Sequence, residues 1–174
     1  MTKSLCERRA ELAPLKLGDF MTLQGRDPLP VMFVYIKPGP LDDGRVACDP
    51  ASPPGDRQVL ERVEKWWQVK KYCSTWSAAP LQSPGVLVAV YGNPRTRRVV
   101  AALRIDRSKW DIAESCDKGL IRVPTLRPRC LDLFELRGRY IESEAGIRFD
   151  RIPAGFYVFL CTNLDLRGGR NPRS

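Results

Sequence analysis

A cluster of arginines lies in a short turn between two apolar stretches of the chain, residues 86 to 91 and residues 99 to 105. Both stretches are rich in β-branched residues, and a Gly-Asn-Pro sequence follows the first, so the pattern predicts a β-hairpin with a basic tip. A guanidinium group can form two hydrogen bonds with one phosphate and can stack on a base. The residue types therefore favour phosphate or base binding at the tip. The tip arginines are Arg95, Arg97 and Arg98.

Large aromatic residues lie near the ends of several expected elements, where rings can line a cleft and stack on bases. Two of the tryptophans are adjacent, and neighbours on a helix differ by about 100° around its axis, so one of them is expected to face the core. For each ring, packing in the core is the alternative to a binding role. The rings selected for a pocket are Trp66, Trp67, Tyr91 and Trp110, and Trp76 and Tyr140 complete the aromatic set.

Further positive charge is expected to border such a pocket. Arg107 follows the second strand of the hairpin, and Lys65, Lys70 and Lys71 lie toward the end of an expected helix. The segment from residue 122 to residue 139 adds more arginine. If these segments share one face with the hairpin tip, they form a groove for a phosphate backbone. A dispersed, solvated set of charges is the alternative.

One carboxylate is a candidate for metal-dependent nuclease chemistry. Asp106 directly follows a strand, although a magnesium site needs at least one more converging oxygen ligand. The alternative for Asp106 is a local turn hydrogen bond or an ion pair with Arg104 or Lys109. The chain has no histidine, which excludes histidine-dependent nucleophilic triads and histidine metal ligands. Its six cysteines form no closely spaced pair, which argues against a zinc knuckle.

The composition is that of a basic chain of the size of one domain. Its 174 residues include 29 Lys and Arg against 20 Asp and Glu, which gives a net charge of +9. The excess favours an acidic partner such as nucleic acid, whereas a GC-rich genome is the alternative source of arginine. No apolar stretch approaches the ~20 residues of a membrane span, and the N-terminal sequence has no export signal, so we expect a cytoplasmic protein that does not bind membranes. We expect a single domain of residues 1–174 with a flexible arm at about 1–18 and a basic tail at about 164–174.

These groups must be positioned by a small number of elements. A nearly continuous apolar run at residues 30 to 36 predicts a central strand, and a loop rich in breakers follows at 37 to 56. Apolar residues at helical spacing predict one amphipathic helix from 57 to about 72, with positive charge toward its C-terminal end, where it suits the helix dipole. An irregular connection is expected at 73 to 84. Later strands are expected at 131 to 141 and 155 to 161. The predicted class is α+β, with a curved, mostly antiparallel sheet or open β-barrel packed by one main amphipathic helix.

The order of these elements resembles that of small PUA-like domains. The resemblance covers about residues 30 to 142 and rests on the strand VMFVYI, the helix ERVEKWW, the hairpin VLVAVYG with VVAALRIDRSKW, and the strand FELRGRYI. PUA-like domains bind RNA or modified DNA bases, in some cases beside nucleases in bacterial restriction and defence proteins. The resemblance implies a flipped base between aromatic walls, which would place Trp66 or Trp67, Trp110 and Tyr91 near the pocket.

Together these patterns favour a nucleic-acid-binding module without enzymatic activity, which contacts phosphates through a basic rim and a flipped or modified base through an aromatic pocket. DNA or RNA is the expected partner, and no cofactor is expected. One alternative is a small metal-dependent nuclease that uses Asp106. Another is a protein-interaction factor, such as a phage or defence-system inhibitor, whose basic face binds an acidic protein.

Overall fold

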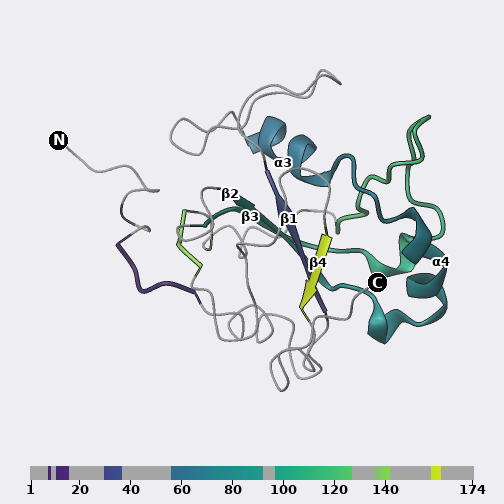
Figure 1. Cartoon of the computed structure of the whole chain (residues 1–174), viewed down its shortest axis with the longest axis horizontal. Coiled ribbons are helices and arrows are strands. Elements are labelled where there is room, and N and C mark those ends of the chain that lie inside the picture. The colour runs from purple at the N-terminus through teal and green to yellow at the C-terminus, as the bar shows by residue number, and fades with distance from the viewer. Residues whose placement is uncertain are drawn as a thin grey trace.

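Figure 1 shows the computed structural model of the protein, which describes residues 8, 11–15, 30–36, 56–91, 97–126, 136, 138–141 and 158–161. Its strands are β1 (Val31–Tyr35), β2 (Val86–Tyr91), β3 (Arg98–Arg104) and β4 (Val158–Cys161). Two α-helices, α3 (Asp56–Glu64) and α4 (Lys70–Ala78), and two short 3₁₀ helices, η1 (Pro80–Gln82) and η2 (Arg107–Lys109), complete the described elements.

The described strands form one mixed sheet in the order β3-β2-β1-β4. β1 runs parallel to β2, whereas β2 with β3 and β1 with β4 are antiparallel. A parallel pair needs a long connection, and the connection here contains α3 and α4. The α+β class, the hairpin and the central strand are therefore confirmed, and β4 lies within the last predicted strand.

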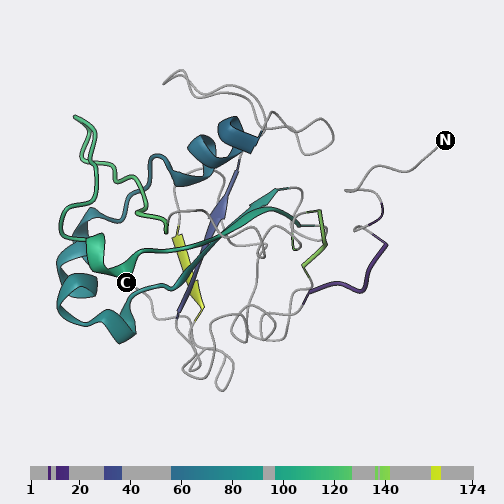
Figure 2. The ribbon, with the colours of Figure 1, turned by 180° about the vertical axis from the view of Figure 1, so that it is seen from behind.

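The strands β1, β2 and β3 are buried on both faces, as the nearly continuous apolar runs of β1 and β2 require. Alternate side chains point to opposite faces: Met32 and Leu87 belong to a cluster with residues of α3 and α4, and Phe33 and Val88 belong to a second cluster. We call the first the helix-side cluster. The second cluster is completed by Leu15, Leu136 and Ile141. In Figures 1 and 2, residues 11–15 and 138–141 lie at one end of the hairpin and α4 lies at the other.

A bulge interrupts the alternation in β3. Ala89 of β2 pairs with Ala101, and Val90 pairs with Val99, so Val100 has no partner on β2. As a result Val100 and Ala101, although adjacent in the chain, both pack in the helix-side cluster. A bulge of this kind adds one residue to one strand and increases the local twist.

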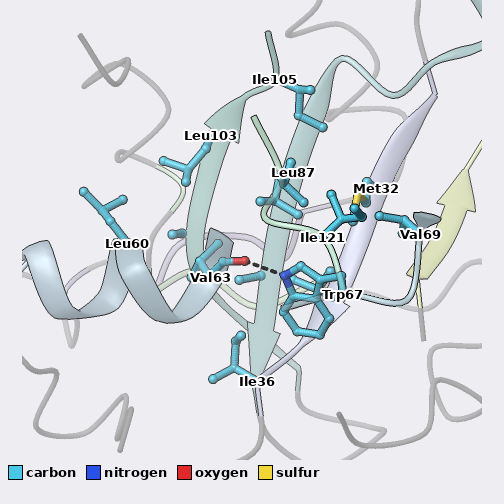
Figure 3. Close-up of a cluster of buried hydrophobic side chains, with 14 of the residues drawn as sticks. Met32, Ile36, Leu60, Val63, Trp67, Val69, Leu87, Leu103, Ile105 and Ile121 are labelled. Atoms are coloured by element: carbon cyan, nitrogen blue, oxygen red, sulfur yellow. Dashed lines mark hydrogen bonds between the residues drawn. The ribbon is translucent and has the colours of Figure 1, made fainter. Parts of the chain in front are cut away.

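The prediction of a single helix from 57 to about 72 is wrong, because the structure divides this stretch into α3 and α4. Between the helices, Trp67 exchanges two backbone hydrogen bonds of 2.9 Å with Ile121. The indole Nε1 of Trp67 donates to the Val63 carbonyl at 2.8 Å, and the ring lies among the buried side chains of Figure 3. Helix propensities of ordinary residues differ by at most about 0.7 kcal/mol, whereas burying one large apolar side chain stabilises by about 1.5–3 kcal/mol. The tertiary contacts of Trp67 therefore override the helical pattern.

The second helix, α4, also alters the predicted positions of two lysines and the structure of the connection predicted at 73 to 84. Lys70 and Lys71 open α4 instead of closing a longer helix, so they lie at the positive end of its dipole, and its first turn has no acidic residue. Most of the connection predicted as irregular at 73 to 84 is helical, in α4 and η1. Trp76 belongs to α4 and is buried.

A buried ion pair joins the end of α3 to the segment after η2. The side chain of Glu64 is 1% exposed and accepts hydrogen bonds from Arg122 Nη2 (2.8 Å), Arg122 Nε (3.2 Å) and Thr125 Oγ1 (2.6 Å). Arg122 Nη1 also donates to Glu114 at 3.1 Å, and the Val123 amide donates to the Glu64 carbonyl at 2.9 Å. Partial burial alone would lower the pKa of Arg122, but the hydrogen bonds and charges of the two glutamates together outweigh it and raise the pKa.

Several predicted features lie outside the described residues: the loop at 37 to 56 except for Asp56, most of the arm at 1–18, and the tail at 164–174. Leu15, within the range of the arm, is described, and it is buried and forms a parallel bridge with Ile141. Among the helices that the structure describes, none is long and apolar enough to cross a membrane.

Candidate nucleic-acid interface

Three residues from adjacent segments form a row at the end of the hairpin that carries its turn. Arg98, the first residue of β3, pairs with Tyr91 of β2 on one side and with Tyr140 on the other. Directly opposite residues of neighbouring strands point to the same face, so the arginine side chain lies between two tyrosines. All three side chains are half-buried, and Tyr91 packs against the helix-side cluster. We call these residues the Tyr–Arg–Tyr row.

Contacts with Tyr140 and Gly138 help to position the guanidinium group of Arg98. Its Cζ lies 5.1 Å from the ring centroid of Tyr140, within cation–π range, and its Nε donates to the Gly138 carbonyl at 3.3 Å. The Arg98–Tyr140 pair lies between backbone hydrogen bonds that join residues 97 and 99 to residues 141 and 139. Such a non-hydrogen-bonded pair brings its side chains closer than the hydrogen-bonded type does. The strand pairing itself thus holds a planar cation against a ring.

The sequence neighbours of the row have structural contacts of their own. Arg97 is 3% exposed, and its Cζ lies 4.2 Å from the ring centroid of Tyr35 on β1. Arg139 Nη2 donates to the Ala13 carbonyl at 2.8 Å. A cation–π contact that is shielded from water contributes about 2 kcal/mol, so Arg97 stabilises the junction of β1 and the hairpin. Because it is buried, Arg97 is not in a position to contact phosphate, although the sequence selected it for that role.

Two of the selected tryptophans are core residues. Trp67 packs in the helix-side cluster, and Trp110 is 1% exposed, with its ring centroid 4.6 Å from that of Trp76. Trp76 in turn stacks on Tyr72, with the ring centroids 5.3 Å apart and the planes at 21°. The alternative of core packing is therefore confirmed for Trp67 and Trp110, and their ring faces are covered by protein.

The remaining basic and aromatic candidates lie elsewhere. Trp66, between α3 and α4, is half-buried with Lys65 Nζ 5.5 Å from its ring centroid. Arg107 in η2 donates from Nη1 to the Pro80 carbonyl at 3.0 Å. Arg98 is the first of the seven residues of β3, and η2 follows the last of them, so the length of the strand places Arg98 about 20 Å from the end of the hairpin that leads into η2. Tyr91 and Arg98 thus lie at the turn end of the hairpin, Arg107 lies beyond its other end, and Trp67 and Trp110 are buried, so the selected residues within the described ranges do not form one groove. Figure 1 shows the hairpin between these two ends. Arg95 lies outside these ranges.

Asp106 has a local structural role. Its Oδ1 accepts hydrogen bonds from the Ser108 hydroxyl (2.6 Å) and amide (3.3 Å), and its Oδ2 lies 3.2 Å from Lys109 Nζ. The hydrogen bond from the Ser108 hydroxyl lowers the pKa of Asp106 most, and Lys109 lowers it further. The predicted alternative of a turn hydrogen bond and an ion pair with Lys109 is confirmed. Among the residues with described positions, no three Cys, Asp or Glu side chains gather as a metal site would require.

The contacts that Tyr140 and Tyr35 make with arginines could not be predicted from the sequence. Tyr140 was part of the aromatic set, but its register opposite Arg98 depends on a pairing across about forty residues of chain. Tyr35 lies in the predicted central strand, where alternation gives its face but not its contact with Arg97.

The chain matches no protein-family model, no curated protein and no solved structure.

Proposed function

We propose that this protein is a nucleic-acid-binding module and that the turn end of the hairpin contacts the nucleic acid. The observation that carries the proposal is the Tyr–Arg–Tyr row, in which a cation and two rings, all half-buried, lie side by side at the turn end of the hairpin. Guanidinium groups suit phosphates and base faces, and phenol rings suit bases, so the row combines the two chemistries that nucleic acids offer.

The charge around the row is consistent with a polyanionic partner. The segments that build it, residues 91, 97–99 and 138–141, contain three arginines in addition to the two tyrosines and no Asp or Glu. The whole chain carries a net charge of +9, which raises the local concentration of an anionic ligand and speeds its association. A neutral or basic partner would have no comparable match here.

The resemblance to PUA-like domains belongs to the same proposal. It requires the mixed sheet to curve toward an open barrel and a base to be taken out of its stack for recognition. We propose a role in bacterial restriction or defence on the same basis. We also propose a cytoplasmic location, which rests on the sequence and not on the resemblance. The aromatic wall of such a pocket would include Tyr91 and Tyr140, because Trp67 and Trp110 are covered by the core.

A titration tests the proposal. The full chain would be added to labelled single- and double-stranded DNA and RNA at about 50 and 200 mM salt, with and without magnesium, and binding followed by fluorescence anisotropy. We expect binding that weakens about tenfold or more between the two salt concentrations, which corresponds to two or more phosphate contacts. Arg98→Gln should reduce the salt slope by about one, whereas Lys118→Gln, an exposed site in the turn after residue 116, should not change it.

The other outcomes separate the alternatives. Absence of binding to all four nucleic acids would refute the proposal and leave the binding of an acidic protein as the function to test. Cleavage that requires magnesium and is lost in Asp106→Ala would establish the nuclease instead. Equal effects of Arg98→Gln and Lys118→Gln would show that the row is not the contact site.

A further inference from the structure

We infer that the Tyr–Arg–Tyr row binds unpaired bases, so that its ligand is single-stranded nucleic acid in an extended form. This inference rests on the proposed function and specifies its ligand. The aromatic faces of the row contribute to affinity by stacking on bases, and base faces in a duplex are covered by the neighbouring base pairs. Sequence-tolerant binding through aromatic residues is accordingly typical of single strands.

The spacing of the row supports an extended strand. Tyr91 and Tyr140 lie on either side of Arg98, so they are separated by two strand spacings, about 10 Å. Successive bases in a stacked helix are about 3.4 Å apart, which is too close for each of two neighbouring bases to use one of these rings. The row therefore fits bases that have been spread apart, with the guanidinium of Arg98 between them.

The rigidity of the row also supports stacking. The guanidinium of Arg98 contacts the ring of Tyr140 and the Gly138 carbonyl, and the side chain of Tyr91 packs against the helix-side cluster. Strand pairing holds the backbones of both tyrosines. Side chains that are ordered before binding lose little conformational entropy when a base stacks on them. Arg97 is buried against Tyr35 and adds no phosphate contact, so stacking has to supply more of the affinity.

Three probes test the inference with the unaltered full chain. The first is a labelled single strand of about 16 nucleotides, the upper site size of a small single-strand-binding fold. The second is the duplex of the same sequence, and the third is the same strand with abasic positions, which keeps the phosphates and removes the bases. We expect the single strand to bind about 5- to 150-fold more tightly than either of the others, the range that one stacked base supplies.

Variants then assign the effect to the row. Tyr140→Leu removes the ring and should weaken binding of the single strand by about 5- to 150-fold without changing the salt slope. Tyr140→Phe keeps the ring and should bind as the unaltered protein does, and thermal unfolding would verify that both variants fold. The comparison of the three probes uses the unaltered protein, so it tests the inference even if the Tyr140→Leu protein does not fold.

The results distinguish this inference from the proposed function. Equal affinity for the single strand, the duplex and the abasic strand, with a normal salt slope, would overturn base stacking while leaving nucleic-acid binding through phosphates. Preference for the duplex would overturn it in the same way. Failure to bind any probe would overturn both.

Discussion

Replacing Arg122 should destabilise the protein more than replacing its partner Glu64. Arg122→Met removes both guanidinium hydrogen bonds from a carboxylate that is 1% exposed, and it leaves the negative charge of Glu64 buried. Glu64→Gln instead leaves a guanidinium that is 26% exposed and still bonded to Glu114, so its charge keeps access to water. The two ends of one ion pair are thus predicted to be unequal.

The magnitudes follow from burial. Breaking a buried pair by removing one partner typically costs about 3–5 kcal/mol, which we expect for Arg122→Met. An isosteric amide in place of the Glu64 carboxylate keeps the shape and one acceptor oxygen, so the expected cost is about 1–3 kcal/mol. Glu114→Gln is the matched control, because Glu114 is 54% exposed and pairs with the same guanidinium at the surface, where such pairs contribute less than about 1 kcal/mol.

Urea denaturation of the three variants measures these differences, with the midpoint and the slope fitted separately so that changes in the unfolded state are recognised. The expected order of destabilisation is Arg122→Met, then Glu64→Gln, then Glu114→Gln. A Glu64→Gln protein that is less stable than Arg122→Met would refute the reasoning, because it would show that the stranded carboxylate is not the costly species. A Glu114→Gln effect as large as that of Glu64→Gln would show that burial does not decide the energy of this pair.

Three other predictions can be checked on single variants. Lys70→Glu should raise the free energy of unfolding by about 0.3–1 kcal/mol, because it replaces a positive charge with a negative one in the first turn of α4, and urea midpoints measure it. Asp106→Ala should lower that free energy by about 1 kcal/mol at pH 7, because it removes the side-chain cap of η2. Since the pKa of Asp106 is lowered in the folded protein, this stabilisation is present above its ordinary pKa of about 4 and is lost as the pH falls through the lower folded value, so in urea titrations the difference between the two proteins should shrink as the pH is lowered below about 4. Burial raises the pKa of Cys73, so brief alkylation followed by peptide mapping should modify half-exposed Cys116 before Cys73, and the reverse order would contradict the buried position of Cys73.

Local pattern was sufficient to predict the strands β1, β2 and β3, although not the order in which they pair. The β-branched runs around the arginine-rich turn determine β2 and β3, and the unbroken apolar run at 30 to 36 indicates a strand covered on both faces. The turn chemistry of Asp106 was also predictable, since an Asp followed two residues later by Ser commonly caps a turn. These features depend only on residues close together in the chain.

Features that depend on distant contacts could not be predicted. No Gly or Pro marks the break between α3 and α4, because the break results from the pairing of Trp67 with Ile121, more than fifty residues away. The division of the tryptophans between core and surface depends on the same packing. Likewise, Arg98 was selected for its charge, but its two tyrosine neighbours follow from strand register, which composition does not encode.

The bulge at Val100 shifts the alternation of side chains in β3 by one residue, so it reverses the faces to which the two preceding arginines point. Counted back from Ala101 in strict alternation, Arg97 would point to the helix side and Arg98 to the opposite side. The extra residue exchanges these positions, so Arg98 joins Tyr91 and Tyr140, and Arg97 is buried against Tyr35. The single extra residue Val100 therefore places two adjacent arginines in different environments: Arg97 is buried in the fold, and Arg98 is partly exposed to solvent.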